Sequence, residues 1–227
     1  MRKTAKSKPI PAIVLHRMAL YHCLLTDWLL AGRNNSTTSK ELANTIGVTD
    51  ATVRNDLSYL GDETGVRGVG YSISSLRGLL GRFLTLPPSA PIAFVGSTKA
   101  LGSIFSFFPP EKFGFIATAF FSEDPSDRGT VVNGHEVHSI EAISPALGNL
   151  GIKVAVVATL PNWIQHSVNL LAKAGIKGVL IITPSTEVMI PDGVKVLHIR
   201  IPCDLKTLLY HANLGEEEEP SSFEMVL

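Results

Sequence analysis

The spacing of apolar residues changes in the segment around residue 88 of this chain of 227 residues. Before that segment, apolar residues recur at helical spacing, as Leu42, Ala43 and Ile46 do. After it, short and largely β-branched apolar runs such as KVAVVAT (153–159) alternate with helical patterns. Such runs are typical of a parallel sheet that is covered on both faces. The pattern therefore predicts a helical domain followed by an α/β domain with a doubly wound, Rossmann-like parallel sheet.

The same spacing gives approximate bounds for the elements. In the first part we expect helices over 12–32 and 72–84, with a pair of shorter helices between them over 38–61. In the second part we expect strands at 92–95, 113–121, 153–159, 178–183 and 194–199, and helices near 100–108, 139–147, 163–174 and 204–213.

The segment TLPPSAP (85–91) separates the two parts, because its prolines stop the preceding helix and stiffen the chain. We therefore expect a first domain over 1–84, a linker over 85–91 and a Rossmann-like domain over 92–203. A terminal helix over 204–214 follows, and the acidic tail 215–227 is expected to be disordered.

The pair of short helices has the sequence signals of a helix-turn-helix. Thr38 precedes Glu41 by three residues, which is the spacing of a capping box. Gly47 breaks the first helix, and either Thr49 or Asp50 can cap the second. The alternative is a helical hairpin that binds nothing.

The second of these helices has an apolar side and a polar side. Val53, Leu57 and Leu60 face one way, and Gly61 ends the helix. The opposite side carries short polar groups and a guanidinium, which are the groups that contact base edges and phosphates in a major groove: Thr52, Arg54, Asn55 and Ser58. Behind it, the glycine-rich run GVRGVGY (65–71) suits a β-hairpin wing, with Arg67 at the tip and Tyr71 at the base.

Charge supports a nucleic-acid-binding first part. Residues 1–86 carry 11 Lys/Arg and 6 Asp/Glu, whereas residues 87–227 carry 9 and 14. Cys23 and Cys203 lie far apart and are expected to be reduced core residues. We expect no membrane-spanning helix, no signal peptide and a cytoplasmic location.

The first strand of the second part leads into FVGSTKALG (94–102), where a dinucleotide site has Gly-x-Gly-x-x-Gly. Gly96 matches the first glycine. Thr98 and Leu101 stand at the second and third positions, and Gly102 comes one residue late. The alternative is an ordinary sheet turn without a ligand.

A ribose-binding acid is expected at the end of the second strand. Ser122 stands there, with Glu123 and Asp124 next in sequence. Lys99 could pair with a phosphate or be solvated, and the loop is not a nucleotide-hydrolysing P-loop. HEVH (135–138) has unsuitable spacing for a metal site on a strand, so we expect no metal, and we identify no catalytic residue.

The run ELANTIGVTDATVRNDLSYLG (41–61), the following GVRGVGY and the Rossmann pattern resemble the redox-sensing transcriptional repressor (Rex) family, over residues 9–211. The resemblance implies a winged helix, a Rossmann domain and a C-terminal helix exchanged between the subunits of a homodimer. It also implies binding to double-stranded operator DNA when NADH is low, and release when NADH binds.

Carried across by position, the resemblance and the pattern together name two sets of residues. The recognition helix keeps the family's Asp56 as well as its polar face. The expected DNA contacts are Lys40, Thr52, Arg54, Asn55, Ser58, Tyr59, Arg67 and Tyr71. The expected NAD(H) contacts are Gly96, Ser97, Thr98, Lys99, Ala100, Leu101, Gly102, Ser122, Asp124 and Pro161. The family's loop reads Gly-x-Gly-Asn-Leu-Gly, and its ribose-binding Asp corresponds to Ser122.

These features are consistent with three functions. The leading hypothesis is a non-enzymatic, homodimeric repressor whose operator binding is modulated by the NADH/NAD redox state. The alternative is a Rex-like DNA-binding regulator whose Rossmann domain has lost NADH sensing and serves as a dimer scaffold or binds another ligand. An NAD-dependent oxidoreductase is less well supported, since no acid/base pair or substrate domain is evident.

Overall fold

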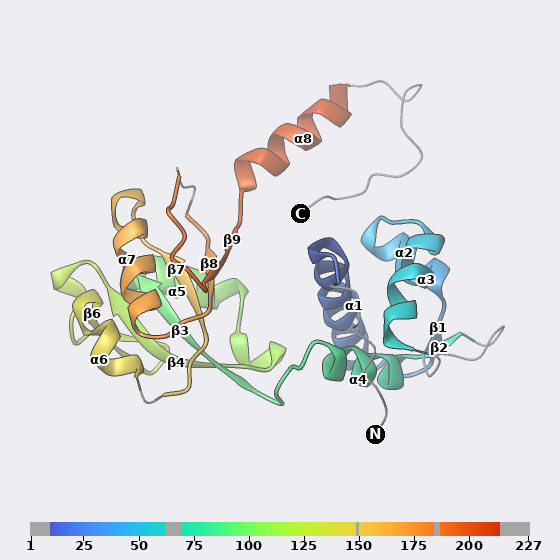
Figure 1. Cartoon of the computed structure of the whole chain (residues 1–227), viewed down its shortest axis with the longest axis horizontal. Coiled ribbons are helices and arrows are strands. Elements are labelled where there is room, and N and C mark those ends of the chain that lie inside the picture. Colours follow the sequence, from blue (N-terminus) through green and yellow to red (C-terminus); the bar gives the residue numbers. More distant parts are fainter. Residues whose placement is uncertain (1–9, 62–69, 149, 184–186, 214–227) are drawn as a thin grey trace. The chain divides into compact units, whose positions relative to one another are not determined.

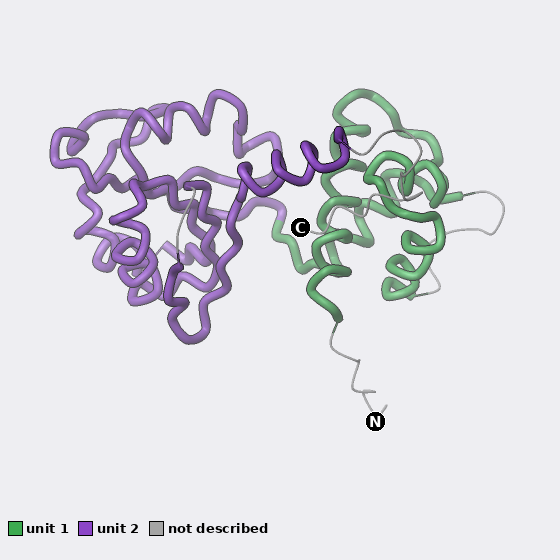
Figure 2. The backbone as a smooth tube through the Cα atoms, turned by 90° about the horizontal axis from the view of Figure 1, so that it is seen from above, with its two compact units in different colours: residues 1–87, 215–227 green, residues 88–214 purple. Residues whose placement is uncertain are grey.

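A computed structural model describes residues 10–61, 70–148, 150–183 and 187–213. The chain folds into two compact units that divide between Pro87 and Pro88 (Figure 2). We call them unit 1 and unit 2 and describe each separately. No helix of the described residues is long and apolar enough to cross a membrane.

Unit 1 is a small helical domain with one antiparallel strand pair (Figure 1). Its elements are α1 (Ala12–Leu30), β1 (Ser36–Thr37), α2 (Ser39–Ile46), α3 (Asp50–Leu57), the 3-10 turn η1 (Ser58–Leu60), β2 (Tyr71–Ser72) and α4 (Ile73–Phe83). The helices pack around a core to which each contributes buried residues. The predicted helices are confirmed, and α1 ends two residues early because the chain turns at Gly32, whose φ is 81°.

Local signals set the ends of the short helices. Thr38 caps α2 by accepting a hydrogen bond from the N–H of Glu41 at 3.1 Å, as the spacing predicted. Gly47 ends α2 in the left-handed conformation, with φ of 76°, which favours glycine. In the strand pair, Thr37 lies opposite Tyr71. Tyr71, the predicted base of the wing, lies in this strand pair, and the predicted wing residues 62–69 lie outside the described residues.

Unit 2 contains a sheet of seven strands in the order β5-β6-β4-β3-β7-β8-β9. The strands are β3 (Ala90–Gly96), β4 (Phe115–Ser122), β5 (Val131–Val132), β6 (His135–Ser139), β7 (Val154–Ala158), β8 (Gly178–Ile181) and β9 (Lys195–His198). All pairings are parallel except that of β5 with β6. Numbered along the chain, the parallel strands have the order 3-2-1-4-5-6 of a Rossmann fold, which confirms the predicted fold class.

Three helices of unit 2 cover the two faces of this sheet: α5 (Thr98–Phe107), α6 (Ile143–Leu147) and α7 (Pro161–Lys173). A fourth helix, α8 (Ile201–Asn213), has no buried residues, and the 3-10 turns are η3 (Pro110–Phe113), η4 (Pro125–Asp127) and η5 (Ile140–Ala142). Successive residues of β3 point to opposite faces. Phe94 packs in one core with residues of α5, and Val95 packs in another with residues of α6 and α7.

Several element bounds differ from the prediction. β3 begins at Ala90, inside the expected linker, because Ala90 and Pro91 already pair with β4. Pro91 is tolerated since β3 pairs with β7 only from Ile92 onwards. The expected helix over 139–147 is a 3-10 turn followed by the short α6, and α8 begins at Ile201 rather than at 204.

The prediction missed the hairpin of β5 and β6. Asn133 and Gly134 connect these strands with φ of 50° and 81°. Two positive φ values at an Asn-Gly pair are typical of a tight hairpin turn.

Candidate functional site

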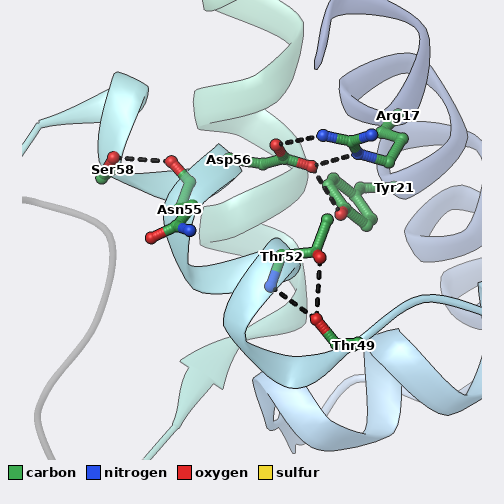
Figure 3. Close-up of polar contacts among 7 residues, drawn as sticks. All are labelled: Arg17, Tyr21, Thr49, Thr52, Asn55, Asp56 and Ser58. Carbon is green, nitrogen blue, oxygen red and sulfur yellow. Dashed lines mark hydrogen bonds and ion pairs between the residues drawn. The ribbon is translucent and has the colours of Figure 1, made fainter. Parts of the chain in front are cut away.

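In unit 1, α3 and η1 present a polar surface on the side away from the core. Val53 and Leu57 are fully buried, as predicted. Arg54, Asn55 and Ser58 are exposed, and the Ser58 hydroxyl donates to the carbonyl oxygen of Asn55 at 2.6 Å (Figure 3). The structure therefore brings these three predicted DNA contacts onto one exposed side of the helix.

The first turn of α3 is held by a threonine cap. Thr49 accepts a hydrogen bond from the N–H of Thr52 at 3.1 Å, and the two hydroxyl oxygens lie 2.8 Å apart (Figure 3). Asp50, the other predicted cap, instead forms an ion pair with Arg54 one turn further on. Both of these side chains are exposed, by 37% and 56%, so water and salt weaken the pair. Arg54 is therefore free to exchange Asp50 for another anion at little cost.

Asp56 is turned inward and joins α3 to α1. Its carboxylate is buried and accepts hydrogen bonds from Arg17 Nε at 2.6 Å, Arg17 Nη2 at 2.8 Å and the Tyr21 hydroxyl at 2.9 Å (Figure 3). Burial, followed by the hydrogen bond to Asp56, raises the pKa of Tyr21 well above its ordinary value. Figure 3 shows Asn55 and Ser58 on the opposite side of the helix. Asp56 thus positions the recognition helix and is not one of its exposed groups.

The remaining predicted DNA contacts have different surroundings. Lys40 is exposed in the first turn of α2, and Tyr59 is exposed in η1. Tyr71 is partly buried against the unit 1 core, so it also has a packing role. Arg67 lies outside the described residues.

In unit 2, the carboxyl ends of β3 and β7 form the point where the strand order reverses, which is where ligands bind in open α/β sheets. Gly96 ends β3 and lies opposite Ala158 of β7. A Cβ atom on Gly96 would lie 2.8 Å from the Ala158 carbonyl oxygen. The close approach of the β7 backbone is therefore enough to require glycine at position 96, whether or not a ligand binds there.

Gly96 and Gly102 should respond oppositely to alanine. Gly96→Ala is expected to destabilise unit 2 by about 1–3 kcal/mol, because the backbone of β7 must shift. Gly102 lies in the middle of α5 with open space around its Cβ position, so Gly102→Ala is expected to stabilise by about 0.5–1 kcal/mol. Urea unfolding of both variants measures the difference. Equal effects of the two substitutions would contradict the expected steric role of Gly96.

The helix that follows β3 packs differently from the glycine fingerprint. Ser97 caps α5 by accepting a hydrogen bond from the N–H of Ala100 at 3.3 Å. Leu101 is fully buried and packs among Phe94 and Phe120, at the position where the fingerprint has its third glycine. Gly102 makes no close approach, so it does not substitute for that glycine. A leucine side chain thus separates α5 from the sheet.

An internal carboxylate occupies the N-terminus of α5. Asp127 Oδ2 accepts a hydrogen bond from the N–H of Thr98 at 2.9 Å, and Oδ1 accepts one from the Thr98 hydroxyl at 2.6 Å. The Ser122 hydroxyl donates to Oδ2 at 2.7 Å. Burial raises the pKa of the Asp127 carboxyl, but the bonds from Thr98 and Ser122 outweigh it and hold the pKa below its ordinary value. The carboxylate form is therefore stabilised.

The other predicted cofactor residues lie around the same edge of the sheet. Lys99 is exposed in the first turn of α5, and Pro161 is exposed at the start of α7. Asp124 is exposed and accepts hydrogen bonds from the N–H and hydroxyl of Ser126. Glu123 Oε1 accepts a hydrogen bond from the N–H of Leu160 at 3.3 Å, which links the ends of β4 and β7.

A pyrophosphate binds at a helix N-terminus through free backbone amides and the positive end of the helix dipole. Here the amide of Thr98 donates a hydrogen bond to Asp127. Ser122, which stands at the position of the ribose-binding acid, also donates to Asp127. In this arrangement the residues do not fit a pyrophosphate at α5. A dinucleotide would have to displace Asp127.

Sequence reasoning missed the roles of Asp56 and Asp127. Asp56 lies three residues after Val53 and four before Leu60, so helical spacing already placed it on the apolar side. Asp127 ends the run SEDPSD (122–127), in which only Glu123 and Asp124 were predicted as candidate acids. No local pattern indicates that it folds back onto Thr98.

Comparisons with known proteins agree with both units. Residues 9–58 match the family model described as "Putative DNA-binding protein N-terminus", and residues 89–185 match the "CoA binding domain" model. The solved structure described as RSP in complex with β-NAD+ and operator DNA superposes with a TM-score of 0.77. It is 25% identical and covers 91% of this chain and 94% of its own.

Relatives match over most of their own length and most of this chain. The redox-sensing transcriptional repressor Rex of Roseiflexus sp. is 33% identical over 88% of this chain and 90% of its own length. The Rex of Streptomyces griseus is 32% identical over 97% and 86%, and that of Clostridioides difficile is 31% identical over 92% and 99%. With an N-terminal unit that matches a DNA-binding family model, a Rossmann unit and this extent of identity, the chain belongs to the Rex family of redox-sensing transcriptional repressors.

Proposed function

We propose that this chain is a homodimeric, DNA-binding transcriptional repressor of the Rex type, whose binding to operator DNA is modulated by the NADH/NAD redox state. The similarity extends over both units, which disfavours a bare scaffold that has lost the ligand. The relatives are named as repressors, so we propose a binding role and no turnover. A repressor acts where the DNA is, and we accordingly propose a cytoplasmic location.

The observation that carries this proposal is the construction of α3. Its polar side is exposed, while Asp56 on the other side is bonded to Arg17 and Tyr21 of α1. A helix held rigidly on one side and left open on the other is suited to enter a major groove. Arg54 can donate two hydrogen bonds to guanine, and Asn55 and Ser58 can contact bases or phosphates.

Selection from a pool of randomised DNA duplexes tests this proposal. The wild-type chain, without NADH, is expected to enrich a sequence with two related half-sites, because a symmetric dimer presents two recognition helices about 34–36 Å apart. The affinity for the enriched duplex should fall linearly on a log–log plot against salt concentration, as counterions are released. Failure to enrich any sequence would contradict the proposal.

Homodimer formation is proposed from α8. None of its residues is buried, and Figure 1 shows it extending from the sheet rather than lying on either face. Ile201, Leu205, Leu208 and Leu209 are exposed by 56–61% and recur at helical spacing. An apolar stripe of this size needs a cover, and the same stripe of a second copy is the cover that the resemblance implies.

A charge on this stripe should separate the subunits. Leu208→Glu is expected to make the protein monomeric at micromolar concentration, because the dimer would have to bury an unpaired carboxylate. Sedimentation velocity measures the oligomeric state. Lys206→Glu, which changes charge on the same helix off the stripe, is the matched control and is expected to leave the dimer intact. A dimeric Leu208→Glu variant would contradict the role of α8.

A further inference from the structure

The positions at which this chain departs from the dinucleotide fingerprint are joined by one carboxylate. Thr98 replaces the second glycine and Ser122 replaces the ribose-binding acid. Both donate hydrogen bonds to Asp127, at 2.6 Å and 2.7 Å from their hydroxyl groups. Asp127 is only 8% exposed. Thr98, Ser122 and Asp127 therefore form a single hydrogen-bonded cluster, and the two departures from the fingerprint are not independent of each other.

Asp127 lies where an anionic ligand would lie. The N–H of Thr98 belongs to the first residue of α5 and donates to Asp127 Oδ2 at 2.9 Å. The unpaired amides of a helix N-terminus, together with its dipole, attract one anion. Here the chain itself supplies that anion. A pyrophosphate arriving at the same place meets a negative charge and an amide that is already bonded.

The backbone around Asp127 holds it in this position. Asp127 is the last residue of the turn η4, which Asp124 caps by accepting from the N–H of Ser126 at 2.9 Å. The carbonyl oxygen of Asp127 accepts hydrogen bonds from the N–H and hydroxyl of Thr130 at 3.0 Å and 2.6 Å. The backbone thus orders the carboxylate before any ligand arrives. Removing the carboxylate from its position breaks its three hydrogen bonds, two from Thr98 and one from Ser122.

We propose that Asp127 is an intramolecular competitor for the phosphate position at the N-terminus of α5, and that it sets the NADH concentration to which this repressor responds. The inference rests on the proposed function, in that it takes NADH as the ligand of this edge of the sheet. A dinucleotide binds only when it displaces the carboxylate from Thr98. The wild-type chain therefore responds at a higher NADH concentration than it would without Asp127.

Three variants of the full-length chain test this inference by isothermal titration with NADH. Asp127→Asn keeps the size of the side chain and removes its charge, and it is expected to lower the Kd for NADH at least tenfold. Thr98→Gly removes one donor to Asp127 and opens the loop, and it is expected to lower the Kd at least threefold. Glu111→Gln is the control, because it removes one negative charge from an exposed position in η3, at the opposite end of β4.

The outcomes separate this inference from the proposed function. A Kd for Asp127→Asn within twofold of the wild-type value, or no NADH binding by either protein, overturns the competitor role. If circular dichroism shows that Asp127→Asn does not fold, Thr98→Gly decides, and an unchanged Kd overturns the role. Operator binding is measured separately in the same preparations. Its absence in the wild type would remove the proposed function, while a tenfold effect on NADH binding would still support the competitor.

Discussion

Replacing Asp56 with alanine is expected to lower the free energy of unfolding of unit 1 by about 3–5 kcal/mol, the cost of breaking a buried ion pair by removing one partner. The carboxylate accepts both hydrogen bonds of the Arg17 fork and one from the buried hydroxyl of Tyr21. Without it, the Arg17 guanidinium loses two hydrogen bonds and the Tyr21 hydroxyl loses one, in a part of the unit where Tyr21 is fully buried. Unit 1 should melt first on heating, and operator binding should be lost with it.

Urea unfolding followed by circular dichroism measures this loss of stability. Asp27→Ala is the matched control, since Asp27 is an exposed carboxylate on α1 of the same unit. An exposed substitution of this kind is expected to change stability by less than about 0.5 kcal/mol. Similar effects of the two substitutions would contradict the anchoring role of Asp56.

Replacing Arg54 with alanine is expected to weaken operator binding by about thirtyfold or more, without unfolding the chain. A good bidentate contact to a base contributes about 1–3 kcal/mol, and a homodimer loses it twice. The fold should be preserved because Arg54 is exposed and its ion pair with Asp50 lies on the surface. Fluorescence anisotropy with the selected operator duplex measures the affinity.

Arg82→Ala is the control for the Arg54 substitution. Arg82 is exposed in the last turn of α4, so the variant loses the same charge away from the recognition helix. Its affinity for the operator is expected to stay within a few fold of the wild-type value. If Arg54→Ala binds as well as Arg82→Ala, then Arg54 makes no direct contact with the operator.

Features that depend on neighbours in sequence were well predicted. Thr38 and Thr49 cap helices through residues three positions away, and Gly47 ends a helix by its own backbone conformation. Alternating apolar runs and helices likewise indicated the Rossmann sheet, because side chains buried on both faces leave few polar positions in a strand. These features can be inferred without knowledge of the tertiary structure.

Features that depend on distant residues were not predicted. Asp56 is hydrogen-bonded to Arg17, which is 39 residues away in sequence, and Asp127 is hydrogen-bonded to Thr98, which is 29 residues away. Each carboxylate looks like a surface residue until the fold brings its donors to it. In the sequence, Thr98 and Ser122 are therefore two separate departures from the glycine fingerprint, whereas in the structure Thr98, Ser122 and Asp127 are one hydrogen-bonded set.

The exposed stripe of α8 makes the fraction of this repressor that is dimeric depend on its concentration. If two copies cover each other's apolar residues, the assembled form gains stability from mass action, and dilution withdraws that gain. Halving the amount of chain would then lower the dimer population more than twofold near the dissociation constant. Expression level becomes a control on operator occupancy that acts even when the NADH/NAD ratio is constant.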